Sequence, residues 1–302
     1  MIVVRVMGGL GNQMFQVAYA RSLALEYGED VYLDISAYDK YKIRNFSLSN
    51  LQVSDLVQYD EKILFSSPQR LFLRSTQKMY HIYQKITKTL TEIDRYGQFP
   101  FRLLTKYGLY YNFDRYYYAS RPSKARLKCV YGYFQSEKYF KKYKQQISEE
   151  LKVKNSVSPR ERDILDAIIQ ENAIAVSLRL GDDYRNSTSL NVCDEDYFIN
   201  AMDKIYKVHP DAVFYVFSDD IDRAKKFNFN YPVRFVEGFK DYESLRLMYS
   251  CKHFVISNSS FSWWGAYLAE HPDKMVIAPD RWYNDTRVKP DIYWDGLTLI
   301  KI

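Results

Sequence analysis

The stretch from residue 160 to 278 alternates regularly between helical and strand-like segments. Each short run rich in Val, Ile and Phe is separated from the next by one segment with helical spacing. The predicted strands are 173–179, 212–217, 233–236, 253–257 and 274–278, and the predicted helices are 160–170, 194–208, 220–227, 241–250 and 260–270. Single helices between strands favour parallel pairing, with helices on both faces of the sheet. The pattern therefore predicts a doubly wound α/β domain.

The first half of the chain opens in the same way. A strand is predicted at 2–6, where it ends in a glycine-rich turn, and a helix with Gly28 at its stop follows over 12–27. Further strands are predicted at 31–35 and 129–134, a helix at 137–153, and mostly helix without a clean strand over 54–128. The polar segment 154–163 is the best candidate linker. We expect two α/β domains, 1–152 and 160–302, with a ligand cleft between them.

Composition narrows the class of protein. The 302 residues are 47% apolar and 26% charged, with 11 Gly and 9 Pro, which excludes a fibrous or disordered chain. No apolar run reaches the roughly 18 residues of a spanning helix, and the apolar start is too short for a signal peptide. We therefore expect a cytoplasmic protein. Cys129, Cys193 and Cys251 are interpreted as reduced thiols, and the four histidines lack zinc-binding spacing.

Charge is distributed unevenly along the chain. The net charge is +6, yet residues 62–150 hold 18 Lys and Arg against 6 Asp and Glu, together with 13 of the 29 tyrosines. Such a block attracts fixed negative charge, and nucleic acid, an anionic membrane and a phosphorylated substrate all carry it. A solvated helical face above half-buried tyrosines explains the block equally well.

The glycine turn at 8–11 resembles a dinucleotide fingerprint only in part. Gly9 and Gly11 follow a strand, but Met14 occupies the place of the third glycine, which argues against a nicotinamide or flavin site. What remains is a turn that brings the backbone close to a ligand, with Asn12 and Gln13 at a helix N-terminus that favours an anion. The alternative is a tight turn with Asn12 as the helix cap.

Three strands of the second half end in polar residues. Arg179, Gly181 and Asp182 follow the first of them, and an arginine there can donate two hydrogen bonds to phosphate oxygens. A structural pair between Arg179 and a neighbouring aspartate is the alternative. Ser218 and Asp219 end the next strand, where they could bind a guanine edge or ribose, or simply cap the following helix.

The strongest motif is the segment 253–270. Its strand delivers Asn258, Ser259, Ser260 and Ser262 into the first turn of an apolar helix, and hydroxyls beside free backbone N–H groups form a phosphate seat. The aromatic residues Trp263, Trp264 and Tyr267 are interpreted as core. Together the motifs predict a cleft for a diphosphate nucleotide. Because no GxxxxGK[ST] loop is present, a magnesium-clamped triphosphate is not expected.

The segments GGLGNQMFQVAYARSLA, SLRLGDDY, FSDD and ISNSSFSWWGAYL together resemble family 11 glycosyltransferases, the α-1,2-fucosyltransferases of bacteria and animals. The resemblance extends over essentially the whole chain. It implies a GT-B fold of two Rossmann-like domains with parallel sheets facing across a cleft. It also implies GDP-β-L-fucose as the donor on the C-terminal side, inversion to an α-1,2 linkage, a galactoside acceptor and no metal.

The resemblance also implies roles for single residues. Arg179 would contact the donor diphosphate, Asp219 the guanine or ribose, and Ser259 and Ser260 would seat phosphate. Apart from the resemblance, Asp182 is our first candidate for the general base. The glycine turn with Asn12 would close the cleft near the reacting sugar. The full set of implied site residues is Arg179, Asn12 and Asp182 as catalytic, and Gly8, Gly9, Gly11, Gln13, Gly181, Ser218, Asp219, Asn258, Ser259, Ser260 and Phe261 as donor-binding. The family's usual histidine and second arginine are replaced here by Ser177 and Leu180.

The expected partners follow from this resemblance and from the basic block. They are a nucleotide-sugar donor, an oligosaccharide or lipid-linked glycan acceptor of bacterial surface polysaccharide or O-antigen synthesis, and an anionic membrane contacted peripherally at its inner face. We expect no nucleic acid partner. Two alternatives stay open at this point: a GT-B enzyme that uses a different nucleotide sugar, and a basic RNA-binding protein.

Overall fold

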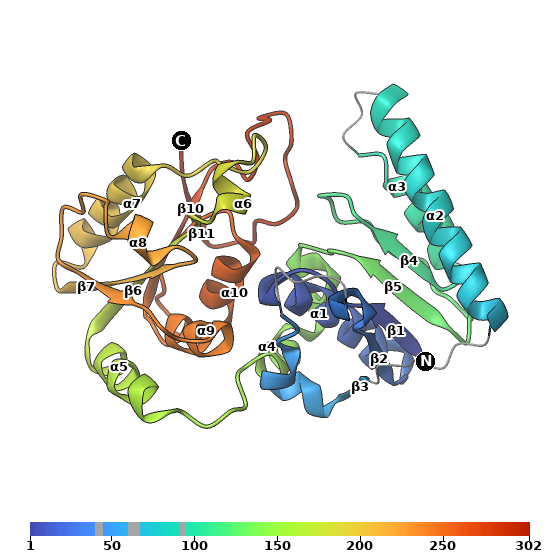
Figure 1. The fold of residues 1–302 in the computed structure, drawn as a ribbon, viewed down its shortest axis with the longest axis horizontal. Coiled ribbons are helices and arrows are strands. Elements are labelled where there is room, and N and C mark those ends of the chain that lie inside the picture. Colours follow the sequence, from blue (N-terminus) through green and yellow to red (C-terminus); the bar gives the residue numbers. More distant parts are fainter. Residues whose placement is uncertain (40–44, 60–66, 91–94) are drawn as a thin grey trace. The chain divides into compact units, whose positions relative to one another are not determined.

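The computed structural model describes residues 1–39, 45–59, 67–90 and 95–302. The chain forms two compact units, Met1–Leu151 and Lys152–Ile302. Each unit is built around one parallel β-sheet (Figure 1). No helix of the described residues is long and apolar enough to cross a membrane.

The first unit holds a five-stranded sheet with the order β3-β2-β1-β5-β4. Its strands are β1 (Ile2–Arg5), β2 (Val31–Asp34), β3 (Val57–Tyr59), β4 (Leu109–Asn112) and β5 (Lys128–Gly132), and its helices are α1 (Leu10–Tyr27), α2 (Ser67–Leu90), α3 (Gln98–Thr105) and α4 (Lys144–Glu150). All strand pairs are parallel. The central strand β1 is nearly fully buried, as expected for its β-branched run.

Two predictions for the first unit are wrong. Residues 54–128 do contain strands, because β3 and β4 complete the sheet at its two edges. Each is only three or four residues long, and the LYYN sequence of β4 lacks the alternation that marks a strand. The helix predicted over 137–153 is instead two short 3₁₀ turns, at Glu137–Tyr139 and Lys141–Tyr143, followed by α4.

Many tyrosines of the basic block belong to the core of the first unit. Tyr80, Tyr110, Tyr111 and Tyr139 are at most 5% exposed. Burial raises the pKa of Tyr80 and of Tyr111. Tyr111 packs in the cluster of α2, β4 and β5 side chains that also includes Leu73, Tyr80 and Cys129. The tyrosine enrichment therefore builds this core to a large extent.

The second unit holds a six-stranded sheet with the order β11-β10-β9-β6-β7-β8, again entirely parallel. Its strands are β6 (Asn172–Leu178), β7 (Ala212–Ser218), β8 (Val233–Val236), β9 (His253–Ile256), β10 (Val276–Pro279) and β11 (Leu297–Ile300). Its helices are α5 (Pro159–Gln170), α6 (Asp182–Arg185), α7 (Glu195–Val208), α8 (Ile221–Ala224), α9 (Asp241–Tyr249) and α10 (Ser260–Leu268). Read from β8, the strand order is that of a dinucleotide-binding fold. The predicted alternation is confirmed, although β11 and the single turn α6 were not predicted.

Two hydrophobic clusters cover the two faces of this sheet. Trp263 and Trp264 of α10 are fully buried and Tyr267 is 4% exposed, so the interpretation of these aromatic residues as core is confirmed. The indole Nε1 of Trp263 donates to the carbonyl oxygen of Ile292 at 2.7 Å. α5 begins at a capping box formed by Ser158 and Glu161, and the buried Glu161 pairs with Arg246 of α9.

Candidate functional site

The site of the second unit lies at the carboxyl ends of β6 and β9. These adjacent strands lead to opposite halves of the sheet, so the crevice between their ends is the position at which open α/β sheets bind ligands. β6 leads into Arg179, and β9 leads into Asn258 and Ser259. The chain topology thus brings together two motifs that are about eighty residues apart in the sequence.

Two carboxylates hold the Arg179 side chain at this edge. Its Nε lies 3.1 Å from Oδ2 of Asp219, and its Nη2 pairs with Asp183. The side chain is 26% exposed, so the guanidinium is partly open to solvent. The structural pair that the sequence left open does exist, and it positions the arginine without burying it.

Asp219, at the end of β7, organises the turn after β6. Its Oδ1 accepts hydrogen bonds from the backbone N–H groups of Leu180 at 2.7 Å and Gly181 at 3.0 Å. A Cβ atom at Gly181 would lie 2.7 Å from Oδ2 of Asp219. Glycine is therefore needed here because the carboxylate approaches the backbone closely. In this structure Asp219 acts on the protein's own turn and on Arg179.

A second arginine, Arg223 of α8, was missed by the sequence reasoning. Its Nη2 lies 2.8 Å from Oδ1 of Asp182, and its Nη1 lies 3.0 Å from both Oδ2 of Asp220 and the carbonyl oxygen of Leu180. Asp220 also caps α8 by accepting from the backbone N–H of Arg223. The alternative with Ser218 or Asp219 as that cap is therefore wrong. Ser218 bonds instead to the backbone of Asp220.

Asn258 fixes the loop between β9 and α10. Its Oδ1 accepts a hydrogen bond from the hydroxyl of Tyr184 at 2.7 Å, and its Nδ2 donates to the carbonyl oxygens of Leu190 and Trp282 at 2.9 Å each. The residue is 6% exposed. All hydrogen-bonding groups of this amide are thus used within the unit, so Asn258 positions the helix start.

The start of α10 presents polar groups that the protein does not itself use. Ser259 is the N-cap residue, but its side chain makes no capping hydrogen bond. Among the described residues, neither Ser259 nor Ser260 makes a side-chain hydrogen bond, and both are partly exposed, as is Phe261. Ser262 differs, because its buried hydroxyl lies 2.6 Å from that of Ser177. A helix N-terminus with two unused hydroxyls is suited to bind an anion.

The two positions that depart from the family pattern both face the interior. Ser177 is 4% exposed and bonds to Ser262, and Leu180 is 7% exposed in the cluster on one face of the sheet. An imidazole at position 177 would replace the hydroxyl that bonds to Ser262. These substitutions are therefore changes of internal packing at the site edge.

Arg281 is a further cation at this edge that the sequence reasoning missed. It follows β10, the neighbour of β9, and its Nε is buried without a hydrogen-bond partner among the described residues. Burial raises the pKa of the Cys193 thiol, and the positive charge of Arg281 lowers it by a smaller amount. The same thiol contacts Asn258. The only signal in the sequence is its place just after a strand, which a single sequence does not distinguish from an ordinary surface arginine.

The glycine turn of the first unit lies between the ends of β1 and β5, the point where strand order changes in that sheet. Gly8 has φ +80°, and a Cβ atom there would lie 2.8 Å from Nδ2 of Asn12. α1 begins at Leu10 with Gly9 as its N-cap, so the alternative with Asn12 as the cap is wrong. Gly11 is buried in the first turn of α1.

Asn12 is held from the neighbouring strand. Its Oδ1 accepts a hydrogen bond from Nε2 of Gln135 at 2.8 Å, just after β5. The preceding residue, Phe134, is the one described non-glycine residue with a positive φ, at 52°. This uncommon backbone conformation directly precedes the residue that contacts Asn12. The sequence reasoning missed both residues, because a single sequence does not reveal that Phe134 has a left-handed backbone conformation or that Gln135 meets Asn12.

Gln13 is fully used inside the first unit. Its Nε2 donates to the carbonyl oxygens of Gly8 at 3.0 Å and Asn45 at 2.7 Å, and its Oε1 accepts from the backbone N–H of Ser47. The side chain is completely buried. Tyr38 donates to the same Gly8 carbonyl at 2.7 Å. Gln13 therefore fixes the shape of the turn through its own hydrogen bonds.

Within the described ranges, neither the cysteines nor any cluster of metal-binding side chains points to a second kind of reactive site. Cys129, Cys193 and Cys251 are buried and free of disulfides, and burial raises the pKa of Cys129 and Cys193 to about 12. In the part of the chain that the structure describes, no group of three His, Cys, Asp or Glu side chains could hold a metal ion.

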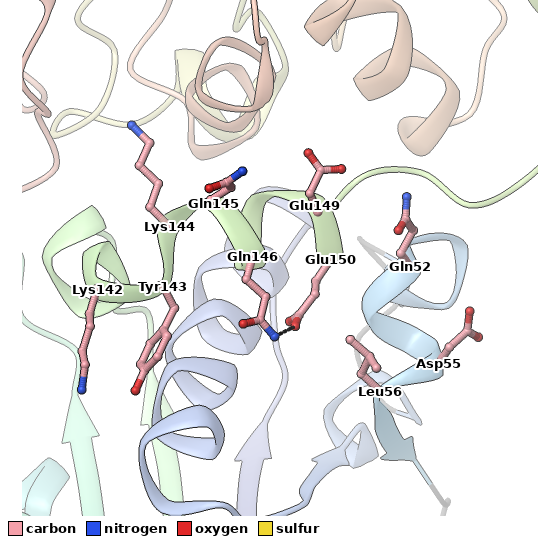
Figure 2. A pocket seen from close by; sticks show the side chains of 10 residues that line it. All are labelled: Gln52, Asp55, Leu56, Lys142, Tyr143, Lys144, Gln145, Gln146, Glu149 and Glu150. Carbon is pink, nitrogen blue, oxygen red and sulfur yellow. Dashed lines mark hydrogen bonds between the residues drawn. The ribbon is translucent and has the colours of Figure 1, made fainter.

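An open hollow of the first unit lies away from the predicted residues. Figure 2 shows it between the turns around Gln52 and the segment from Lys142 to Glu150. Its lining mixes both signs of charge, and Gln146 donates to Glu150 at 3.0 Å. Glu150 in turn pairs with Arg21 of α1 at 2.8 Å. None of the predicted site residues lines this hollow.

Comparisons with known proteins agree with this architecture. The family model described as glycosyl transferase family 11 matches residues 1–300. The α-1,2-colitosyltransferase of Escherichia coli is 28% identical over 293 residues, covering 93% of this chain and 92% of that protein. The O-antigen biosynthesis glycosyltransferase WbnK of Escherichia coli is 29% identical over 299 residues, covering 91% and 93%.

Among solved structures, the fucosyltransferase NodZ from Bradyrhizobium matches with a TM-score of 0.53 at 16% identity, over 89% of this chain and 92% of that one. A crystal structure of NodZ with GDP gives the same values. This likeness concerns the fold. With two parallel-sheet α/β units and a family match over residues 1–300, the chain belongs to glycosyl transferase family 11 and has the GT-B fold.

Proposed function

We propose that the protein transfers fucose from GDP-β-L-fucose to a galactoside hydroxyl, with inversion to an α-1,2 linkage, in the synthesis of a bacterial surface polysaccharide or O-antigen. The observation that carries the proposal is the arrangement at the ends of β6 and β9. A partly exposed Arg179 on one strand end stands at the same crevice as the α10 N-terminus, with Ser259 and Ser260, on the next. Such an edge suits a diphosphate.

The reaction requires negative charge to be stabilised on the leaving group. When the acceptor hydroxyl attacks the anomeric carbon, positive charge develops on the sugar and negative charge on the GDP phosphates. Arg179 can donate two hydrogen bonds to those oxygens, and the N–H groups at the start of α10 add a positive partial charge. Arg281, which follows the neighbouring strand β10 and whose Nε has no partner among the described residues, would add a second cation. The second unit would therefore bind the donor.

A general base is needed to remove the proton of the acceptor hydroxyl. Asp182 remains our first candidate, with its side chain 73% exposed and 2.8 Å from Nη2 of Arg223. Asn12, held by Gln135, is assigned to orient the reacting sugar from the first unit.

Calorimetric titration tests the donor assignment. GDP and GDP-fucose should bind to the wild-type protein, whereas UDP-, CDP- and TDP-linked sugars should not. The matched pair of variants is Arg179→Ala at the site and Arg162→Ala on α5, where Arg162 pairs with Asp166 on an exposed surface. If Arg179→Ala loses GDP binding and Arg162→Ala keeps it, the proposal is supported. Preferred binding of another nucleotide would contradict it.

The relative named α-1,2-colitosyltransferase supports a second candidate, transfer of colitose, at 28% identity over most of the chain. Colitose is fucose without its 3-hydroxyl group, so both donors present the same GDP to the second unit. Turnover with GDP-fucose and with GDP-colitose at equal concentrations separates the two. A higher kcat/KM for GDP-colitose would show that colitose and not fucose is the transferred sugar, and the assignment of GDP as the nucleotide would stand.

A further inference from the structure

The helix α2 carries an apolar stripe on its outer face. Leu71 is 68% exposed, Phe72 54%, Met79 69%, Ile82 49% and Ile86 51%. At about 100° per residue, these five side chains fall within roughly one third of the helix circumference. Isolated exposed apolar residues are common on proteins, but a continuous stripe of this kind marks an interaction surface.

The same helix is strongly basic. Its 24 residues contain five Lys and Arg and no Asp or Glu. The five cations are all exposed, and they occupy the sector beside the apolar stripe; they are Arg70, Arg74, Lys78, Lys85 and Lys88. An outer face divided between apolar and cationic sectors is typical of helices that lie in the headgroup region of a bilayer.

The inner face of α2 is already occupied by its own unit. Leu73 and Tyr80 pack against β4 and β5 side chains, and Thr76 lies 3.0 Å from the hydroxyl of Tyr111. His81 contacts Tyr131 of β5 at 2.9 Å. Figure 1 shows α2 running along the β4 side of the first sheet. The outer stripe is therefore surplus to the core, and the helix is fixed with this stripe outward.

The short helix α3 extends the same kind of surface. Phe99 is 75% exposed and Leu103 46%, whereas Phe101 between them is fully buried. Tyr107, just after the helix, is 66% exposed. The hydroxyl of Tyr83 in α2 donates to the carbonyl oxygen of Tyr96 at 3.0 Å, which ties α2 to the segment that leads into α3. Arg102 and Lys106 keep this second patch basic.

Helices of the second unit show what an ordinary solvated face looks like in this protein. The exposed residues of α7 include Lys204 and Lys207, but Glu195, Asp196 and Asp203 balance them on the same helix. α5 likewise pairs Arg162 with Asp166. Of these three helices, only α2 contains no acidic residue, and it also exposes a row of large apolar side chains.

We propose that α2 and α3 together form a docking surface for an anionic lipid bilayer. The occupant follows from charge complementarity. A second copy of this chain packed antiparallel through the stripe would bring one cationic sector against the other, and in any packing it would add five further cations, whereas an anionic bilayer neutralises the cations and accepts the apolar side chains at once. The helix would lie in the plane of the bilayer, since its five charges prevent it from spanning.

Vesicle co-sedimentation of the full chain tests this surface. The wild type should bind vesicles of equal parts phosphatidylcholine and phosphatidylglycerol and should not bind pure phosphatidylcholine. Because each cation near an anionic surface contributes about 1 kcal/mol, or about fivefold, the triple reversal Arg74→Glu, Lys78→Glu and Lys85→Glu should weaken partitioning by at least about a hundredfold. Replacing Leu71, Met79 and Ile82 by Ser should weaken it by about tenfold for each inserted side chain.

Two matched controls make the result specific. Reversal of Lys141, Lys142 and Lys144 changes the same charge within the same basic block but away from α2, and replacement of Ile169 and Val208 by Ser removes exposed apolar residues of the second unit. Both should leave at least a third of wild-type binding. GDP affinity should be unchanged in every variant, and an unchanged circular dichroism melt shows that the variants fold.

Three outcomes would overturn the proposal. Equal loss in the α2 reversal and the Lys141, Lys142 and Lys144 reversal would indicate unspecific electrostatic attraction. No binding of the wild type to anionic vesicles would remove the surface altogether. A dimer in analytical ultracentrifugation that the Ser variants dissociate would assign the stripe to a second copy of the chain. Since GDP binding is measured separately, failure here leaves the proposed donor chemistry standing.

Discussion

The two units share a plan but differ in how their sheet edges are completed. Both place a loop at the point where strand order changes, with Gly8 in the first and Gly181 in the second. In the first unit the turn is closed by internal amide contacts from Gln13 and Asn12. In the second unit, Ser259, Ser260 and the Nε of Arg281 have no such partner among the described residues.

The first unit carries a net positive charge and the second a net negative charge, although the proposed phosphate site lies in the second. Residues 1–151 hold 23 Lys and Arg against 14 Asp and Glu, and residues 152–302 hold 20 against 23. The proposed diphosphate site thus lies in the more acidic unit, because a few positioned groups at a strand edge matter more than the net charge around them. The excess positive charge of the first unit serves another surface.

The largest expected effect is the loss of turnover and GDP binding on mutation of Arg179, which tests the loop of the second unit against that of the first. Arg179→Ala should lower kcat by about a hundredfold, about 3 kcal/mol, and should weaken GDP binding, because it removes donors from the developing phosphate charge. Steady-state kinetics with GDP-fucose and calorimetry measure both.

Asn12→Ala is the matched test in the first unit. It should lower kcat while leaving GDP affinity within about twofold of the wild type, because Asn12 is assigned to the sugar. If both variants lost GDP affinity equally, the division of roles between the units would be wrong.

The second effect concerns pH and is confined to the second unit. Burial and the nearby His209, His271 and Lys252 lower the pKa of His253 to about 4. The unfolded chain therefore binds this proton more readily, and stability falls as pH drops from about 6.5 to 4. The loss of unfolding free energy should reach about 3 kcal/mol.

Urea unfolding between pH 7 and 4 measures this effect. His253→Asn retains an acceptor for the backbone N–H of Met275, which Nδ1 of His253 binds at 3.0 Å, and should flatten the pH dependence. An equally steep dependence in the variant would assign it to other groups.

The third effect tests the rigidity of the first loop. Gly8→Ala adds a methyl group 2.8 Å from Nδ2 of Asn12 at φ +80°, which should cost about 2–3 kcal/mol of stability and reduce turnover. Gly28→Ala is the control, because its φ is +64° but nothing lies within 4 Å of the added atom. It should cost only about 1 kcal/mol and leave turnover unchanged. Thermal melts and initial rates distinguish them, and equal losses would show that backbone strain alone decides.

The smallest expected effect tests whether Arg281 belongs to the donor site of the second unit. Arg281→Ala should weaken GDP binding by about tenfold, the usual size of a lost charge-assisted hydrogen bond. Arg287→Ala, an exposed arginine that pairs with Asp285, should change it less than twofold. Unchanged GDP affinity in Arg281→Ala would remove this residue from the donor site.

Much of the second unit could be predicted from its sequence, because buried parallel strands and their helices carry separate, regular patterns. Arg179 and Ser259 were found as candidates because both directly follow such strands. Arg223 and Arg281 were not, because what singles them out is a set of contacts, or their lack, with residues distant in the chain. The short edge strands β3 and β4 were missed since tertiary pairing, and not local propensity, forms them.

By itself the sequence determined the alternating α/β plan, the strand-end motifs and the family, because hydrophobic period and motif residues are local properties of the chain. Only the tertiary structure decided that Gln13 and Asn258 serve the protein's own loops and that Ser177 and Leu180 face the core. It alone also separated the buried tyrosines of the basic block from the exposed stripe of α2. The reason is that burial and hydrogen-bond partners depend on which distant segments meet, and local pattern does not encode this.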